Sequence, residues 1–227
     1  MLKNLKLNSK IAELIGMHIG DGSLYKTKSC LVWELRGSLK EKDYYNSNVK
    51  PILEGIFNLE FRPKFRSGGK NGCFGIQTSK KQVTNLFLNL GFHPGRKTHN
   101  ATVPDYILSS KDSIKISFIR GLFDTDGCIR FDKINKQKLH TYPRIELGFA
   151  SLKLRDGLAT LIRKLGFRCF IWGNKNYVVC LAGKDQTTKW FKIVKPNNKK
   201  HLNRFEFWRE RGYYKPRSHS LAIAVIF

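Results

Sequence analysis

A tandem repeat constrains the fold of this 227-residue chain more than any other feature of its sequence. Residues 14–22 (LIGMHIGDG) and 119–127 (IRGLFDTDG) both end an apolar, helix-length stretch in Asp-Gly, and their aspartates, Asp21 and Asp126, are 105 positions apart. Residues 38–40 (SLK) recur as residues 151–153, and further matches follow in the same order. A conserved order at a nearly constant offset indicates one unit duplicated within the chain.

Each copy of the repeat alternates helical and strand patterns. In the first copy, apolar residues at helical spacing predict helices over 11–20, 42–59 and 80–90. Alternation of apolar and polar residues predicts strand pairs over 25–36 and 61–78. The second copy repeats this pattern from residue 115. We therefore predict an α+β fold, in which a duplicated αββαββα unit forms two antiparallel sheets with helices on the back.

The repeat also predicts how the chain is divided. We expect a first subdomain over 1–92 and a linker over 93–114, a segment that contains three turn-forming residues, Pro94, Gly95 and Pro104. A second subdomain over 115–195 and a basic C-terminal extension over 196–227 follow. The lysines and arginines of the extension indicate either a segment that contacts a nucleic-acid backbone or a solvated charged tail, and the sequence leaves both open.

The charge of the chain indicates its partner. Its 42 lysines and arginines against 17 acids give a formal net charge of +25, more than solubility requires, while 41% hydrophobic residues are enough to form a core. A large polyanion is the expected partner, and nucleic acid is favoured over an anionic membrane. We expect the positive charge to be spread over the two sheets, with fewer charges on the helices behind them.

Membrane and secretory classes are not indicated. The longest apolar run, residues 221–227, is too short to span a bilayer, and the start of the chain has no signal-type segment. The five cysteines are scattered without a C-x-x-C pair, so neither a zinc site nor a disulfide framework is predicted. We expect an intracellular protein, and the sequence does not distinguish a prokaryotic cytoplasm from an organelle.

Small residues recur four positions apart on both repeat helices. They are Ala12, Gly16 and Gly20 on the first helix and Ser117, Gly121 and Thr125 on the second. Residues at this spacing share one helix face, so each helix presents a small-residue stripe to which another helix can pack closely. If the two helices pair about a pseudo-twofold axis, their C-terminal ends bring Asp21 and Asp126 together.

Two aspartates at neighbouring helix ends need a countercharge. The C-terminal end of a helix carries partial negative charge and facing carboxylates repel, so a divalent cation relieves both effects. Mg²⁺ takes carboxylate, carbonyl, water and phosphate oxygens, and carboxylates that share metal beside a polyanion suit phosphodiester hydrolysis. The alternative is that each Asp-Gly only ends its helix, with the glycine in the left-handed conformation. Recurrence at matched positions favours the metal.

Both segments resemble the signature of the LAGLIDADG homing endonucleases, in their single-chain, two-motif form. Residues 121–127 (GLFDTDG) match closely, and residues 14–22 match at the leucine, both inner glycines and the final Asp-Gly. The repeat of helices and strands extends the resemblance over about residues 9–195.

This resemblance implies a fold and a site. The fold would be two saddle-shaped sheets that grip the major groove of DNA. Asp21 and Asp126 would be the catalytic, metal-binding acids, and the backbone carbonyls of Gly20 and Thr125 would add ligands to Mg²⁺, for which other divalent cations can substitute.

The resemblance also implies basic residues after the first hairpin of each copy, where this chain has Lys40 and Lys153. We assign both as catalytic. Relatives often have Gln or Asn directly before these lysines and this chain has leucine, so Ser38 and Ser151 are the polar replacements to consider. Further candidates for transition-state charge stabilisation are Lys80 and Lys184. A phosphate-positioning or solvent-facing role stays open for each lysine.

A two-stranded ribbon fits the major groove, so polar residues on the strands are candidates to contact DNA. In the first copy these are Tyr25, Thr27, Ser29, Glu34, Arg36, Lys64, Arg66 and Lys70. In the second copy they are Arg130, Lys133, Arg144, Glu146, Arg168, Trp172, Asn174 and Lys175. The phase of residues 145–149 is left open, because apolar residues occupy the positions expected to be polar.

The predicted function is a monomeric, site-specific, Mg²⁺-dependent DNA endonuclease that cuts both strands of a long, nearly asymmetric double-stranded site. An alternative on the same scaffold is a maturase that binds intron RNA, and a third is a DNA-binding regulator without chemistry. We rank both lower because both aspartates are present. An intein is disfavoured, since Met1 stands where a splicing Cys or Ser is needed and the chain ends in Ile-Phe.

Overall fold

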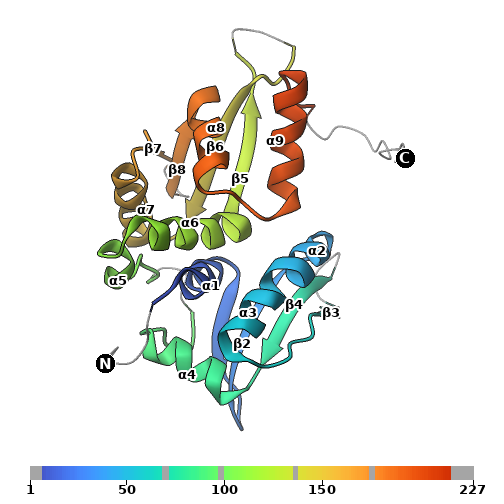
Figure 1. Ribbon diagram of the computed structural model, residues 1–227, viewed down its shortest axis with the longest axis vertical. Helices are drawn as coiled ribbons and strands as arrows, with labels where there is room; N and C mark the ends of the chain where they lie inside the picture. Colours follow the sequence, from blue (N-terminus) through green and yellow to red (C-terminus); the bar gives the residue numbers. More distant parts are fainter. Residues whose placement is uncertain (1–6, 68–71, 97–99, 135–137, 174–176, 216–227) are drawn as a thin grey trace.

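The computed structural model describes residues 7–67, 72–96, 100–134, 138–173 and 177–215. Two four-stranded antiparallel sheets lie on either side of a central pair of helices, α1 and α6 (Figure 1). The strand orders are β1-β2-β4-β3 and β5-β6-β8-β7, so the same topology occurs twice. The predicted α+β duplication is confirmed.

Over its described residues, the first copy contains four α-helices and four strands. They are α1 (Ser9–Gly20), β1 (Gly22–Lys26), β2 (Leu31–Ser38), α2 (Lys42–Tyr44), α3 (Lys50–Phe57), β3 (Lys64–Arg66), β4 (Cys73–Thr78) and α4 (Lys81–Asn89). The helix predicted over 42–59 is irregular, because a π-helical turn, Tyr45–Val49, joins α2 to α3. This helix ends two residues earlier than predicted, since Asn58 adopts a left-handed conformation (φ 51°).

The second copy follows the same order after a short connecting helix. Its elements are α5 (Asp105–Leu108), α6 (Asp112–Asp126), β5 (Gly127–Asp132), β6 (Tyr142–Phe149), α7 (Leu152–Lys164), β7 (Phe170–Trp172), β8 (Tyr177–Ala182), α8 (Lys184–Ile193) and α9 (Lys199–Arg211). The boundary placed between residues 114 and 115 falls inside the first turn of α6, which begins at Asp112. The expected linker is also partly structured, because it contains α5 and the buried Val103 and Ile107.

Each sheet buries one face against helices. In the first sheet, Leu24 pairs with Trp33 and Leu35 with Ile76, and all four side chains are buried. In the second, Ile129 pairs with Ile145 and Leu147 with Val179, also buried. The intervening residues of each strand point to the opposite side, which we call the open face.

The described part of the C-terminal extension is a packed helix and not a solvated tail, whereas its contact with a nucleic-acid backbone stays a prediction. Phe205 and Trp208 of α9 are buried, and the Trp208 indole donates to the backbone oxygen of Thr141 at 2.8 Å. The ring of Phe131 on β5 lies 6.0 Å from that of Trp208 (centroid to centroid), and Figure 1 shows α9 alongside β5. The helix therefore covers the buried face of the second sheet at its edge.

The distribution of charge differs from the sequence-based expectation. On the eight strands, the lysines and arginines are Lys26, Arg36, Lys64, Arg66, Arg130 and Arg144. Helices α7 and α9 together carry more lysines and arginines than these strands do.

Among the described residues, no helix is long and apolar enough to cross a lipid bilayer.

Candidate metal centre and nucleic-acid interface

Helices α1 and α6 contact each other backbone to backbone through their small residues. A Cβ atom added at Gly16 would lie 2.1 Å from the backbone oxygen of Phe118, and one at Gly121 would lie 2.0 Å from that of Glu13. Gly121 stands 105 positions after Gly16, and Phe118 stands 105 positions after Glu13, so the two contacts are equivalent under the offset that relates the repeats. The helices are therefore related by a pseudo-twofold axis, and only glycine fits at either position.

The same axis brings the C-terminal ends of the two helices together. A Cβ at Gly20 would lie 2.1 Å from the hydroxyl oxygen of Thr125 and 3.4 Å from the carboxyl carbon of Asp126. Asp21 directly follows Gly20 and caps α1, with its N–H donating to the carbonyl of His18. The aspartates thus stand on adjacent helix ends, and each leads into the first strand of its sheet.

The glycines after the aspartates are required by packing, not by a left-handed backbone. Gly127 is extended (φ −79°, ψ 163°), and Gly22 is not among the positive-φ residues. A Cβ at Gly22 would lie 2.6 Å from the Cα of His18, and one at Gly127 would lie 2.5 Å from the backbone oxygen of Phe123. The alternative in which Asp-Gly is a left-handed helix stop is therefore wrong for both copies.

Oxygen atoms at this junction match the chemistry of a hard divalent cation. Within the described residues, no group of three or more His, Cys, Asp or Glu side chains could hold a metal. The protein would thus supply the carboxylates of Asp21 and Asp126, with carbonyls, water and substrate phosphate completing the shell, as Mg²⁺ sites commonly do. The carbonyl of Thr125 accepts a hydrogen bond from Lys200 Nζ at 2.8 Å, which leaves one of its two lone pairs.

A buried tyrosine and an acid flank this centre. Burial, together with the negative charges of Asp21 and Glu41, raises the pKa of Tyr45 well above its ordinary value, so its hydroxyl stays protonated. Glu41 accepts a hydrogen bond from the N–H of Ser38 at 3.0 Å and closes the 3₁₀ turn Leu39–Glu41. Lys40 projects from this turn and is exposed.

Lys153 occupies the matching place in the second copy, in the first turn of α7. Ser151 caps that helix by accepting from the N–H of Leu154 at 3.3 Å, and its hydroxyl donates to the carbonyl of Ala101 at 2.7 Å. Ser151 is buried, so it serves as a cap and not as a polar partner near solvent. Ser38 likewise accepts from the N–H of Lys40, at 3.3 Å, but is exposed.

Lys80 and Lys184 each follow a strand, at the end of the strand that is far from the turns of Lys40 and Lys153. Strand β4 pairs Cys73 with Ser38 at one end and Thr78 with Trp33 at the other, and Lys80 follows the second end. The Lys80 ammonium lies 3.4 Å from the backbone oxygen of Glu60. In the second sheet, one end of β8 pairs with Phe149, and Phe149 precedes the turn of Lys153. Lys184 follows the other end of β8. This placement is unfavourable for stabilising charge at the aspartates.

The open face of the first sheet carries a connected polar network. Register places Ser23, Tyr25, Glu34, Arg36, Lys64, Arg66 and Gln77 on this face. Glu34 accepts from Ser23 at 3.2 Å and from Tyr25 at 3.4 Å, and it forms an ion pair with Arg36. Five of these residues were candidates from the sequence, whereas Ser23 and Gln77 were not.

The pairing of β5 with β6 shows which of residues 145–149 lie on the open face of the second sheet. Arg130 pairs with Arg144 and Cys128 with Glu146, while Ile145 is buried on the other side. Arg144 Nε lies 2.6 Å from Asp132 Oδ2, and Arg130 Nε lies 2.9 Å from Asp132 Oδ1. One carboxylate therefore fixes two guanidinium groups side by side. Asp132 was not among the candidates, because its contact with Arg144 arises from strand pairing and not from a local sequence pattern.

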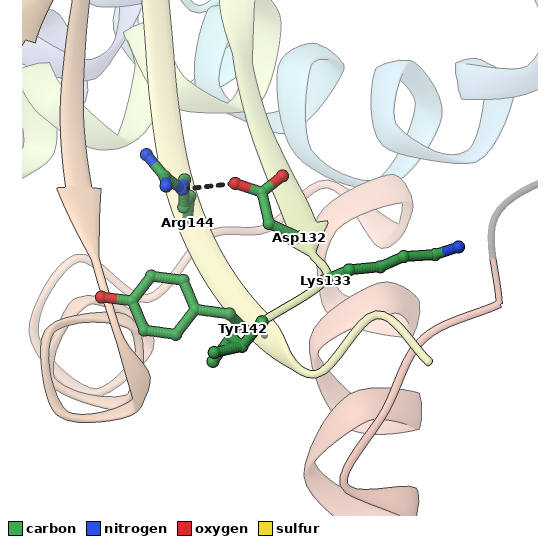
Figure 2. Close-up of a pocket in the computed structure, with 5 residues that line it drawn as sticks. Asp132, Lys133, Tyr142 and Arg144 are labelled. Atoms are coloured by element: carbon green, nitrogen blue, oxygen red, sulfur yellow. Dashed lines mark ion pairs between the residues drawn. The ribbon is translucent and has the colours of Figure 1, made fainter. Parts of the chain in front are cut away.

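Figure 2 shows the hollow beside this ion pair. It has a volume of about 620 Å³ and is lined by Asp132, Lys133, Ile134, Tyr142 and Arg144. The Arg144 guanidinium lies 5.7 Å from the centre of the Tyr142 ring. A guanidinium held between a carboxylate and an aromatic ring has a defined orientation, which suits hydrogen bonding to a base edge.

The remaining candidates lie in turns, on or just before β7, or outside the described residues. Thr27 and Ser29 are in the turn between β1 and β2, where the Thr27 hydroxyl donates to the backbone oxygen of Cys30 at 2.9 Å. Arg168 precedes β7, and Trp172 is on β7 with 42% of its surface exposed. Lys70, Asn174 and Lys175 lie outside the described residues.

A buried junction that no sequence pattern indicates joins the motif helices to the C-terminal segment. The Asp124 carboxylate accepts from the backbone N–H of Asn197, at 2.9 Å, and of Asn198, at 3.1 Å. Glu13 forms an ion pair with Arg120 at 3.1 Å and accepts from the Asn197 side chain, also at 3.1 Å. Asp124 and Glu13 therefore both anchor the segment that precedes α9.

Comparison with known proteins agrees with this fold. Residues 113–179 match the family model of the LAGLIDADG-like domain. An uncharacterized protein of Methanocaldococcus jannaschii is 27% identical over 197 residues, which are 82% of this chain but 21% of that protein. A DNA polymerase of Thermococcus hydrothermalis is 26% identical over 71% of this chain and 8% of its own length. The chain thus spans only a small part of these relatives.

Solved structures of homing endonucleases have a similar fold. I-DmoI in complex with DNA and Mn superposes with a TM-score of 0.58 at 18% identity, over 83% of this chain and 98% of that chain. I-WcaI bound to its DNA recognition sequence gives a TM-score of 0.60 at 16% identity, over 90% and 88%. The resemblance to single-chain, two-motif LAGLIDADG homing endonucleases is confirmed, by the family model for the second copy and by the fold for both.

Proposed function

We propose that this protein is a site-specific endonuclease that cleaves both strands of a long double-stranded DNA site, with divalent metal held by Asp21 and Asp126. The observation that carries the proposal is the pairing of α1 and α6, which places the two aspartates on adjacent helix ends between two similar sheets. The net charge of +25 supports a polyanionic substrate. Homing endonucleases of the same fold are described with DNA and Mn, Mg or Ca, which supports DNA over intron RNA.

Each part of the chain has a distinct task in this proposal. The open faces of the two sheets bind the two halves of an asymmetric site in the major groove, through the polar network around Glu34 and the arginines held by Asp132. Divalent metal, when bound, neutralises charge on the scissile phosphate and lowers the pKa of water. Lys40 and Lys153 place positive charge near the phosphates, and Asp21 and Asp126 provide oxygen ligands.

The experiment is selection of cleaved sites from a random duplex library in the presence of Mg²⁺, followed by assays of single variants on the selected site. Asp21→Asn and Asp126→Asn should each reduce cleavage by about 100-fold or more, the scale on which losing one electrostatic partner of a transition state slows a reaction. Both variants should still bind the duplex without metal, because the sheets are unchanged.

Asp185→Asn is the matched control. Asp185 is exposed in the first turn of α8, so its substitution removes the same charge at a place away from the ends of α1 and α6. Cleavage that survives both aspartate substitutions would exclude the proposed metal centre. A protein that binds duplex but selects no cleaved site under any divalent cation would instead be a DNA-binding regulator.

A further inference from the structure

The segment that leads into α9 joins three elements through one buried amide. Asn198 is 2% exposed, and its Nδ2 donates to Glu41 Oε1 at 2.7 Å and to the backbone oxygen of Asp124 at 2.9 Å. Its Oδ1 accepts from the N–H of Lys200 at 3.1 Å and so caps α9. One side chain therefore links the start of α9, the end of α6 and an acid of the first subdomain.

Lys200 makes the same connection with its charge. The ammonium lies 2.9 Å from Glu41 Oε1 and 2.8 Å from the carbonyl oxygen of Thr125, the residue before Asp126. The Glu41 side chain is 11% exposed and that of Lys200 33%, so water screens this pair less than a surface pair. A buried carboxylate left without its partner is costly, which makes the link between the subdomains strong.

Glu41 transmits this link to the turn that carries Lys40. Its second oxygen, Oε2, accepts the N–H of Ser38, and this hydrogen bond closes the 3₁₀ turn over residues 39–41. A continuous set of contacts thus runs from Lys200 and Asn198, through Glu41, to Lys40. The set begins at the helix end that bears Asp126.

Among the residues that the structure describes, the second copy has no counterpart of this link. Leu154 stands three residues after Ser151, as Glu41 stands three residues after Ser38. The turn of Lys153 is held instead by the Ser151 hydroxyl, which bonds to the carbonyl of Ala101. The C-terminal helix therefore supports only one of the two lysine-bearing turns.

We propose that Asn198 and Lys200 are positioning residues, which hold the turn of Lys40 in place relative to the end of α6. The proposal rests on the proposed function. Because only one of the two turns depends on this link, its loss should slow cleavage of one DNA strand and leave the other strand near its normal rate.

The test resolves the two strands. With a selected duplex labelled separately on each strand, Lys200→Met should slow cleavage of one strand by about 10- to 100-fold, the cost of a small misplacement of a catalytic group, so that nicked DNA accumulates. Affinity for the duplex should be unchanged. Lys200→Arg, which keeps the charge, should restore most of the rate. Asn198→Ser, which keeps the helix cap but loses both donated hydrogen bonds, should behave like Lys200→Met.

Matched controls lie on the same helix. Lys199 pairs with Asp43 at 3.0 Å across the same boundary, but both side chains are about two-thirds exposed, so Lys199→Met should stay within about twofold of the parent. Asn203 is exposed, and Asn203→Ser controls for Asn198→Ser. If Lys200→Met is too unstable to assay, Glu41→Gln breaks the same ion pair from the other side while keeping the side-chain shape.

A second measurement does not depend on cleavage. Amide hydrogen exchange of the segment around residues 37–41 in the DNA-free protein should be faster in Lys200→Met than in Lys199→Met, because the Ser38 N–H loses its fixed acceptor. Equal rates on both strands in all variants, or equal slowing of both strands, would overturn the proposal while leaving the endonuclease intact. A parent protein that cleaves no DNA would overturn the proposed function, and hydrogen exchange would still test the link.

Discussion

At the scale of residues, glycine marks the place where α1 and α6 contact each other through their backbones. At Gly16 and Gly121, the position of an added Cβ is already taken by a backbone oxygen of the partner helix, at 2.1 and 2.0 Å. A backbone atom cannot move aside as the end of a flexible side chain can, so any larger residue must push α1 and α6 apart. Because both aspartates stand on the ends of these helices, the glycines also control the distance between them.

Gly121→Ala should lower the free energy of unfolding by about 3 kcal/mol, the upper range for overpacking a close contact. Gly55→Ala is the control. A Cβ there meets only the mobile ammonium of Lys10, and alanine favours a helix over glycine by about 1 kcal/mol, so this variant should be as stable as the parent or more so. Urea unfolding of both variants measures the difference. Equal stability of the two would mean that the helices do not meet through Gly121.

His201 is a residue whose protonation opposes folding. It is 1% exposed, and its ring lies 4.3 Å from that of Phe123. Burial, with the charges of Lys200 and Arg204, lowers the pKa of His201 from 6.5 to about 3. Below pH 6.5, His201 is therefore protonated in the unfolded chain but stays neutral in the folded protein. The free energy of unfolding falls as the pH drops from about 6.5 toward 3.

Between pH 7 and pH 5, this residue should account for a loss of about 2 kcal/mol in the free energy of unfolding. Replacing it in His201→Phe should remove that part of the pH dependence. Unfolding curves of the parent and the variant at both pH values give the difference directly. Since buried acids such as Asp124 act in the opposite direction over the same range, the comparison between the two proteins is the test, and parallel pH profiles would contradict it.

At the scale of elements, strand register decides which side chains can meet DNA. Arg130, Arg144 and Glu146 come to the same open face because β5 and β6 pair Arg130 with Arg144 and Cys128 with Glu146. Asp132 then holds both guanidinium groups, so their directions are set before DNA arrives. A side chain that is oriented in advance loses less conformational entropy on binding than a free lysine does.

Arg144→Lys tests this arrangement. Lysine keeps the charge but loses the planar, two-donor geometry, so discrimination at one base pair of the selected site should fall by about 1–3 kcal/mol. The salt dependence of binding should stay the same, because no charge is lost. Competition binding with single-base variants of the site measures discrimination. A uniform loss of affinity for every variant would instead assign Arg144 to the phosphate backbone.

At the scale of the whole molecule, opposite charges are separated by position. The excess of 25 positive charges covers sheets and helices alike, and it attracts DNA from a distance. Several of the 17 acids gather where α1, α6 and the start of α9 meet, among them Glu13, Asp21, Glu41, Asp124 and Asp126. A cluster of acids in a basic protein thus lies at the place where a cation and a phosphate would be held together.

Binding to duplex DNA should depend steeply on salt. Contacts to about 6–10 phosphates would reduce affinity by about 10³–10⁵ between 50 and 200 mM monovalent salt. Equilibrium binding to the selected duplex without divalent metal, at several salt concentrations, gives the slope. A change of less than about tenfold over this range would mean that the basic surface is not the binding surface.

The pattern of residues was enough to predict the architecture. Repeated Asp-Gly segments, helical spacing and strand alternation are local or periodic signals, so they predicted the duplicated α+β fold and the pairing of α1 with α6. Element ends were less accurate: α6 begins at Asp112 and Asn58 ends α3, because capping and packing shift helix ends by a few residues.

The sequence by itself determined the repeat, the matched aspartates, the small-residue stripes and the charge, since each depends only on the order of residues. Tertiary structure decided the rest. Asp132 became a partner of two arginines through strand pairing, and Asn198 and Lys200 reached Glu41 although more than 150 positions separate them in the chain. No local pattern encodes such contacts, because they arise only when the C-terminal helix packs on the second sheet and brings its first turn against the first subdomain.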